Sequence, residues 1–193
     1  MQTERQIQII ESALELIAEK GIQGMTIKNL SKKIGVSEPA IYRHFESKSA
    51  ILLSILNNFK QMAGMMAGMI PTIEGTAFDK IEFMFSKIIQ LFIDSPSYVS
   101  VIFSEEIFKN DDKLKKNIID VLDQNEQTIE GIIREGQKNG DTRTDIDSKN
   151  LATIVMGSLR FLVKQWDIKG QNKNLRKEGN QLLSSLKLII SKS

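Results

Sequence analysis

The sequence has no cysteine, only three prolines and a single histidine among 193 residues. Without cysteine the chain can form no disulfide bond, no thiolate metal site and no cysteine nucleophile. No apolar run reaches the roughly 18 to 20 residues that a membrane-spanning helix needs. The first residues, MQTERQIQII, also lack the basic and apolar regions of a signal peptide. We therefore expect a cytoplasmic protein.

The net charge of +2 is concentrated in one part of the chain. Residues 1–60 hold eight Lys or Arg against six Asp or Glu, and the charges of residues 61–193 cancel. The excess is concentrated between Thr26 and Lys48, where five Lys or Arg residues face two Glu residues. Such a basic patch is usually a solvated face, but it also agrees with binding of nucleic acid.

Two helical patterns open the chain. Thr3 and Gln6 have the spacing of a capping box, and apolar residues then recur at helical intervals (Ile7, Ile10, Leu14 and Ile17) until Gly21, which we expect to end the first helix. Thr26 and Gly35 then bound a second helix of about two turns.

A third short helix follows Gly35 almost at once. Ser37 can cap it, and Pro39 falls in its first turn, where a missing N–H costs little. Ile41 and Phe45, four residues apart, share the inner face of this helix, so Tyr42 must point outward. Two short helices joined by a glycine-containing turn form a helix-turn-helix, whose second helix can enter the major groove of DNA.

The rest of the chain is also helical in pattern. A long helix begins at Lys48 and is closed by Pro71, and Thr76 can cap a helix that ends at residues 94–96. Further helices are predicted from Ser97 through the segment YVSVIFSEEIF and over about 112–138. A loop is predicted at 139–145, and the last two helices are predicted over 148–168 and 175–190. No strand pattern occurs, so we predict an all-α fold.

The segment from Ala13 to Leu56, ALELIAEKGIQGMTIKNLSKKIGVSEPAIYRHFESKSAILLSIL, resembles the DNA-binding domain of the TetR family of bacterial transcriptional regulators. The resemblance implies a helix-turn-helix domain over residues 1–47 and a helical effector-binding and dimerisation domain over residues 48–193. It also implies a homodimer that binds a palindromic operator. It further implies the DNA-contacting residues, which are Thr26, Lys28, Ser37, Glu38, Pro39, Ala40, Tyr42, Arg43, His44 and Lys48.

Roles for these residues follow from the resemblance. Tyr42, His44 and Lys48 would contact phosphates, and the N-terminus of the helix that begins at Lys48 attracts an anion. Lys28, Glu38, Pro39 and Ala40 are candidates for base-edge or methyl contacts. The operator sequence does not follow from these residues.

The C-terminal part is rich in methionine and aromatic residues. We expect either plain core packing or an apolar pocket for a hydrophobic effector, such as an acyl chain or a lipophilic drug. For Arg160, a charge in an apolar helix, three roles fit the pattern: pairing across a dimer, contact with solvent, or binding of an anionic head group. The candidate pocket residues are Met62, Met65, Met66, Met69, Phe85, Phe92, Phe103, Phe108, Arg160, Phe161 and Trp166.

The last two predicted helices carry wide apolar stripes, which predict a homodimer through a four-helix interface. We expect a ligand-responsive repressor whose effector shifts the long helix after Lys48 and so changes the separation of the two recognition helices. The alternative is a C-terminal domain that binds a protein partner, as in TetR-like nucleoid-occlusion factors. We expect no cofactor, no metal and no enzyme activity, because Glu105 and Glu106 diverge on a helix and no catalytic motif occurs.

Overall fold

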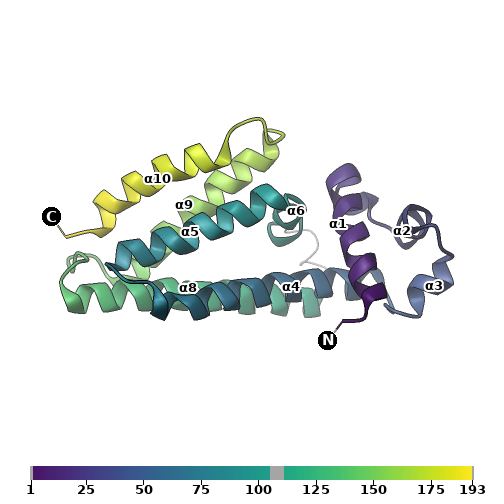
Figure 1. Cartoon of the computed structure of the whole chain (residues 1–193), viewed down its shortest axis with the longest axis horizontal. Helices are drawn as coiled ribbons and strands as arrows, with labels where there is room; N and C mark the ends of the chain where they lie inside the picture. The colour runs from purple at the N-terminus through teal and green to yellow at the C-terminus, as the bar shows by residue number, and fades with distance from the viewer. Residues whose placement is uncertain (1, 105–110, 193) are drawn as a thin grey trace. The chain divides into compact units, whose positions relative to one another are not determined.

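The computed structural model describes residues 2–104 and 111–192, and it is built of α-helices (Figure 1). The helices are α1 (Glu4–Gly24), α2 (Ile27–Ile34), α3 (Glu38–Tyr42), α4 (Lys48–Met69), α5 (Ala77–Asp94), α6 (Ser97–Ile102), α8 (Asp112–Asn139), α9 (Ser148–Ile168) and α10 (Leu175–Ile190), with a 3-10 turn η1 (Ile70–Thr72) after α4. The described residues contain no β-strand, only an isolated antiparallel bridge between Thr142 and Ser191. The all-α prediction is confirmed.

α1 begins as predicted, and it is interrupted at the predicted glycine although one more helical turn follows. The Thr3 hydroxyl accepts a hydrogen bond from the Gln6 backbone N–H at 3.2 Å, and the Gln6 side chain accepts from the Thr3 N–H at 3.0 Å, which completes the predicted capping box. Gly21 interrupts the helix at the predicted residue, with φ 67° and ψ 176°, and a further helical turn then runs up to Gly24. Glycine takes this positive-φ conformation without a Cβ clash, so it allows the kink between the two helical stretches of α1.

The longer helices begin and end close to the predicted residues. α4 ends at Met69, just before Pro71, and α9 and α10 have the predicted bounds. The helix predicted from Ser97 ends as α6 at Ile102, and the last residues of that prediction, from 105 on, lie outside the described part of the chain.

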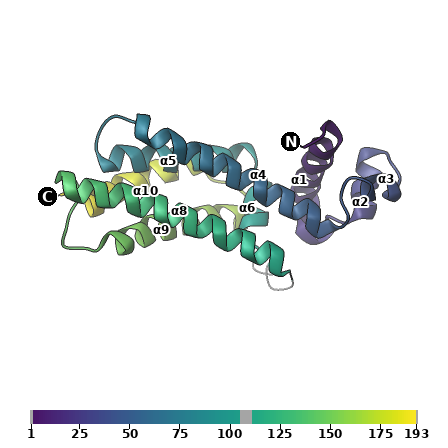
Figure 2. The ribbon, with the colours of Figure 1, turned by 90° about the horizontal axis from the view of Figure 1, so that it is seen from below.

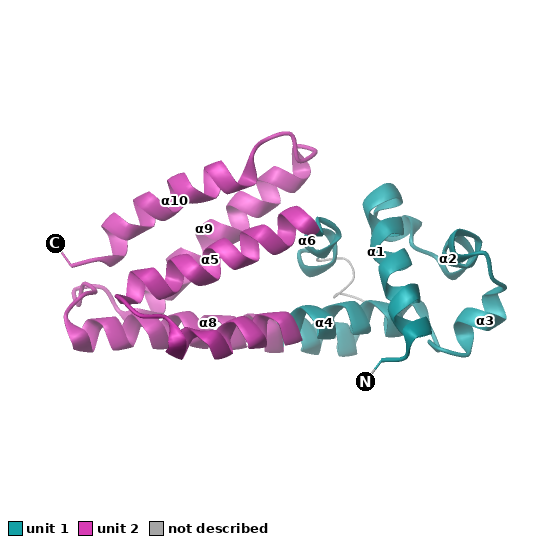
Figure 3. Ribbon diagram, viewed as in Figure 1, with its two compact units in different colours: residues 1–60, 95–119 teal, residues 61–94, 120–193 magenta. Residues whose placement is uncertain are grey.

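The chain divides into two compact units (Figure 3). Unit 1 comprises residues 1–60 and 95–119, and unit 2 comprises residues 61–94 and 120–193. α4 and α8 are continuous helices that each contribute residues to both units. The functional boundary expected between residues 47 and 48 stays a prediction.

In unit 1, α1 packs against both α2 and α6, and α2 packs against α3. The core face of α1 is therefore wider than the single predicted stripe. Ile9 and Ala13 are fully buried, whereas Ile7, which the periodicity placed in the core, is exposed. Two packing partners shift and widen the buried surface of a helix in a way that its own periodicity does not reveal.

In unit 2, α10 lies along α5 and also packs against α9 (Figure 1). A Cβ atom at Gly179 on α10 would overlap the end of the Ile89 side chain on α5, so a larger residue there would force Ile89 to move. The C-terminus lies beside the turn after α8 (Figure 2), where the Lys192 N–H donates to the Asp141 carbonyl at 3.1 Å. In the described part of the chain, no helix is both long and apolar enough to span a membrane.

Candidate functional site

The helix-turn-helix is built from a short α3 held against α2. Gly35 joins the two helices in a left-handed conformation, φ 76°, and its N–H donates to the Ser31 carbonyl at 3.0 Å. Ile41 and Phe45 are buried beneath α3, while 50% of the surface of Tyr42 is exposed on the opposite side. The predicted division of α3 into an inner and an outer face is confirmed.

All ten predicted DNA-contacting residues lie in unit 1. The exposed ones are Thr26, Lys28, Ser37, Pro39, Tyr42 and Arg43, and the half-buried ones are Glu38, Ala40, His44 and Lys48. Two of them stand at helix starts. The Thr26 hydroxyl caps α2 by accepting from the Asn29 N–H at 3.1 Å, whereas the side chain of Ser37, at the start of α3, makes no capping hydrogen bond.

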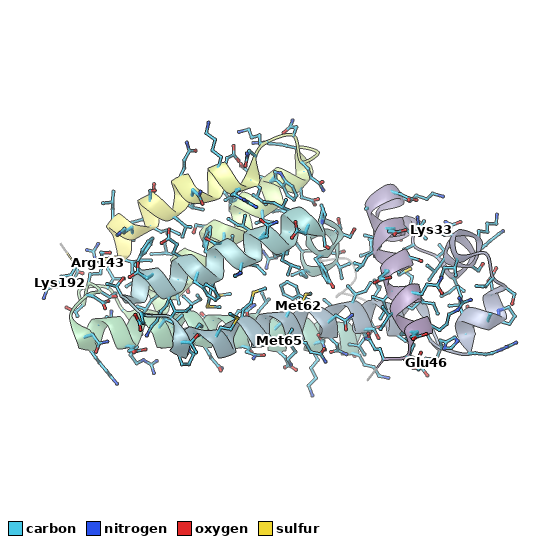
Figure 4. All side chains as sticks on the ribbon, viewed as in Figure 1. Lys33, Glu46, Met62, Met65, Arg143 and Lys192 are labelled. Carbon is cyan, nitrogen blue, oxygen red and sulfur yellow. The ribbon has the colours of Figure 1, made fainter. Side chains whose placement is uncertain are left out.

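The charges of the predicted basic patch do not all face the same way. Lys33 on α2 lies against α1, where its Nζ is 3.1 Å from Glu15 Oε2 and 2.8 Å from Glu19 Oε1 (Figure 4). The hydrogen bond from Lys33 lowers the pKa of the Glu19 carboxyl. Lys28, Lys32 and Arg43 have exposed side chains. The exposed cations of the helix-turn-helix are thus fewer than the sequence count suggests.

Side chains distant in sequence fasten the helix-turn-helix to α1. Gln6 Nε2 donates to the His44 carbonyl at 3.4 Å, and Lys48 Nζ donates to the Ile22 carbonyl at 2.8 Å. Sequence reasoning assigned Gln6 only to the capping box and missed this second contact, since no local pattern links residues 38 positions apart. These hydrogen bonds set the position of the end of α3 and of the start of α4.

The segment after α5 also belongs to unit 1. The buried Ser97 hydroxyl on α6 donates to the Leu14 carbonyl of α1 at 2.7 Å. Asp111, before α8, accepts from the Leu114 N–H at 3.1 Å, and a hydrogen bond from Ser49 on α4 contributes most to lowering the pKa of its carboxyl. These contacts attach the segment to α1 and α4, and no sequence signal indicated them.

The candidate pocket residues fall into different environments. Phe85, Phe92 and Trp166 are buried, and Trp166 Nε1 donates to the Lys173 carbonyl at 3.0 Å. The remaining described candidates are half-buried (Met62, Met66 and Phe103) or exposed (Met65, Met69, Arg160 and Phe161). Phe103 belongs to unit 1, and Phe108 lies outside the described residues, as do Glu105 and Glu106. Figure 4 labels Met62 and Met65 on α4.

Unit 2 contains further apolar side chains that are neither buried nor fully exposed. They lie on α5 and α9, and the sequence did not indicate them as pocket residues: Met84, Ile88, Leu91, Met156, Leu159 and Leu162. Long apolar side chains with residual exposure can repack around a ligand more easily than a closed core can. Periodicity could have found them, but it does not distinguish a half-buried residue from a buried one.

Two other surfaces of unit 2 differ in character. A shallow groove of about 480 Å³ along α10 is lined by residues of polar or charged type: Asn174, Arg176, Lys177, Asn180, Gln181 and Ser184. Large exposed apolar side chains lie elsewhere on the last two helices: Ile154, Phe161 and Ile168 on α9 and Leu188 and Ile189 on α10. Among the described residues, no group of three or more His, Cys, Asp or Glu side chains could hold a metal ion.

Two families match consecutive parts of the chain. The family described as bacterial regulatory proteins, tetR family, matches residues 9–55, and the family described as YsiA-like protein, C-terminal region, matches residues 59–191.

Individual proteins match over nearly the whole chain. The fatty acid metabolism regulator protein of Bacillus subtilis (strain 168) is 25% identical over 182 residues, which cover 93% of this chain and 92% of that protein. The nucleoid occlusion factor SlmA of Marinomonas sp. (strain MWYL1) is 22% identical over 186 residues, covering 88% and 94%. The crystal structure of the transcriptional regulator FadR from Bacillus subtilis in complex with stearoyl-CoA has a TM-score of 0.79 at 25% identity, covering 93% of this chain and 96% of that one.

Proposed function

Because the chain belongs to the TetR family of bacterial regulatory proteins and is therefore a ligand-responsive transcriptional repressor, we propose that its effector is a long-chain acyl-CoA thioester. The observation that supports this effector class is the similarity to FadR in complex with stearoyl-CoA, which extends over 93% of the chain. The half-buried Met, Leu and Ile side chains of unit 2 agree with it, because flexible apolar side chains can enclose an acyl chain. A cytoplasmic location accords with this role.

The DNA-contacting surface of the proposal is the outer side of the helix-turn-helix. Tyr42 and Arg43 are exposed beside α3, where they can reach phosphates as two recognition helices enter successive major grooves. Lys28, Glu38, Pro39 and Ala40 are proposed to face base edges. His44 is proposed to lie against the DNA backbone, while Thr26 and Ser37 flank the helix starts.

The homodimer is proposed to form through α9 and α10. Phe161 is 65% exposed, Ile168 is 73% exposed and Leu188 is 82% exposed, which are large values for apolar side chains of this size. Burial of such residues against a second copy would remove apolar surface from water. A two-fold arrangement would also supply the second recognition helix that a palindromic operator requires.

Release of DNA is proposed to run through α4. This helix is continuous from Lys48 to Met69, with residues 48–60 in unit 1 and residues 61–69, which include Met62 and Met66, in unit 2. An effector that binds one position of α4 more tightly than another would change the position of the helix-turn-helix. The coupling between effector and operator would be about 1 to 3 kcal/mol.

The test is operator binding by fluorescence anisotropy, with a duplex selected by the protein from a random-sequence pool. Stearoyl-CoA should lower the affinity about 5- to 150-fold, the range that such coupling produces, and free CoA should leave it unchanged. Unchanged affinity across a series of acyl-CoA chain lengths would contradict the proposed effector class. That result would favour the partner-protein function for which the similarity to SlmA provides a precedent.

A further inference from the structure

Lys48 makes a contact that differs from the phosphate contact implied by its place in the helix-turn-helix motif. Its side chain is half-buried, and its Nζ donates to the backbone carbonyl of Ile22 at 2.8 Å. Both residues lie in unit 1. The ammonium group is thus directed toward the end of α1 and engaged there.

The Ile22 carbonyl lacks its normal helical donor because α1 ends at Gly24 and the next residue, Met25, has an extended backbone. In a regular α-helix this carbonyl would accept from the N–H of residue 26. Here the Thr26 N–H donates to the Gly24 carbonyl at 3.1 Å instead. An unpaired carbonyl at a helix end needs another donor, and the Lys48 ammonium supplies one.

The same short connection is held from α2 as well. Asn29 Nδ2 donates to the Gly24 carbonyl at 2.9 Å, so side chains from α2 and α4 both bind the last residues of α1, where the α1–α2 connection begins. Immediately before Lys48 in the chain, the Ser47 hydroxyl accepts a hydrogen bond from the Ala50 N–H at 3.1 Å and caps the first turn of α4. Lys48 therefore joins a capped helix start to a connection that is already fixed.

We propose that Lys48 is a positioning residue for operator binding, which fixes the start of α4 to the α1–α2 connection through the Ile22 carbonyl instead of neutralising a DNA phosphate. The inference rests on the DNA-binding function proposed above. In this role, Lys48 aligns the helix-turn-helix with α4, the helix through which the effector is proposed to act. Arg43, exposed beside α3, remains the kind of residue that contacts phosphate.

The two roles differ in their response to salt. Each phosphate neutralised by a cation contributes about 0.9 to the slope of log affinity against log salt concentration. Loss of a phosphate contact therefore lowers the magnitude of that slope by about one. Loss of a positioning contact weakens binding at every salt concentration and leaves the slope unchanged.

The experiment measures this slope for Lys48→Met and Arg43→Met with the selected duplex. Lys48→Met should bind about tenfold more weakly, the loss expected for one hydrogen bond from a charged group, with the wild-type slope. Arg43→Met is the matched control and should lower the slope by about one. A slope for Lys48→Met that falls as far as in the control would overturn the proposal.

A second variant, Lys48→Arg, tests the proposal if Lys48→Met does not fold. Lys48→Arg retains the charge, and a phosphate accepts arginine at least as well as lysine, so a phosphate contact predicts undiminished affinity. The positioning role predicts weaker binding, since a planar guanidinium does not match a half-buried site shaped for an ammonium. Undiminished operator affinity of Lys48→Arg would overturn the inference alone. If the wild-type protein selected no duplex, both the inference and the proposed DNA-binding function would be overturned.

Discussion

Both units of the molecule have a buried apolar core, and they differ in the length of their helices and in how many long apolar side chains remain half-buried. Unit 1 contains short helices whose positions depend on side-chain hydrogen bonds to distant backbone carbonyls, as from Gln6 to His44 and from Ser97 to Leu14. Unit 2 contains long helices with apolar contacts, and several of its methionine and leucine side chains remain half-buried. Directional hydrogen bonds fix one geometry, whereas flexible apolar side chains tolerate several. Under the proposed function, the difference suits a DNA-binding unit held in one geometry and a ligand-binding unit whose side chains can repack.

The largest expected difference between the units concerns truncation of apolar side chains. Ile41→Ala should lower the free energy of unfolding by about 3 kcal/mol and abolish operator binding, because Ile41 is fully buried beneath the recognition helix. Met66→Ala, the matched change at a half-buried position of unit 2, should cost about 1 kcal/mol. Urea unfolding followed by circular dichroism measures both. Equal losses would remove the distinction between a closed and an adaptable interior.

The next effect concerns the exposed apolar surface of unit 2. Phe161→Asp should dissociate the homodimer at micromolar concentration, because it places a carboxylate in the proposed apolar interface at a cost of about 2 kcal/mol or more. Light scattering gives the oligomeric state. Lys164→Asp, a charge change on a half-buried side chain of the same helix, serves as a comparison for general effects of charge. A dimeric Phe161→Asp protein would place the interface elsewhere.

A smaller effect isolates one hydrogen bond in unit 1. Gln6→Glu keeps the acceptor for the Thr3 N–H in the capping box but removes the donor to the His44 carbonyl. Operator affinity should fall about fivefold, the typical value of one hydrogen bond, with little change in the melting temperature. Gln6→Ala loses both contacts and should lower affinity and melting temperature together. Wild-type affinity in Gln6→Glu would show that the contact with His44 does not position α3.

The smallest effect depends on pH. Hydrogen bonds from Ser49 and from the start of α8 depress the pKa of Asp111 below its usual value of 3.8, so its carboxylate stabilises the folded state above that value. This contribution is lost as the pH falls through the depressed pKa. Asp111→Asn, which can still cap α8, should cost about 0.5 kcal/mol at pH 7, and the difference from wild type should shrink below pH 4. A difference that persists in acid would exclude the charge as its cause.

The sequence predicted local structure well. Periodicity located α9 and α10, Pro71 marked the end of α4, and Gly35 marked the turn of the helix-turn-helix, because each signal acts within a few residues. The outward direction of Tyr42 followed from the burial of its neighbours. These features depend on backbone sterics and on side-chain spacing, which are properties of the segment itself.

Features that depend on distant residues could not be predicted. The end of α1 at Gly24 leaves the Ile22 carbonyl without a helical donor, and only the tertiary structure brings Lys48 to that carbonyl. The exposure of Ile7 and Phe161 likewise depends on which helices pack against α1 and α9. Burial is a property of two surfaces in contact, and periodicity describes only one of them.

Amide hydrogen exchange with and without stearoyl-CoA would test the central claim most directly, because it reports protection segment by segment. Binding of stearoyl-CoA should slow exchange most in unit 2, in the helices that carry Met62, Met66, Met84 and Leu159, with free CoA as the control. Unchanged exchange throughout unit 2 at saturating stearoyl-CoA would contradict the account of this unit as the receptor for an acyl effector.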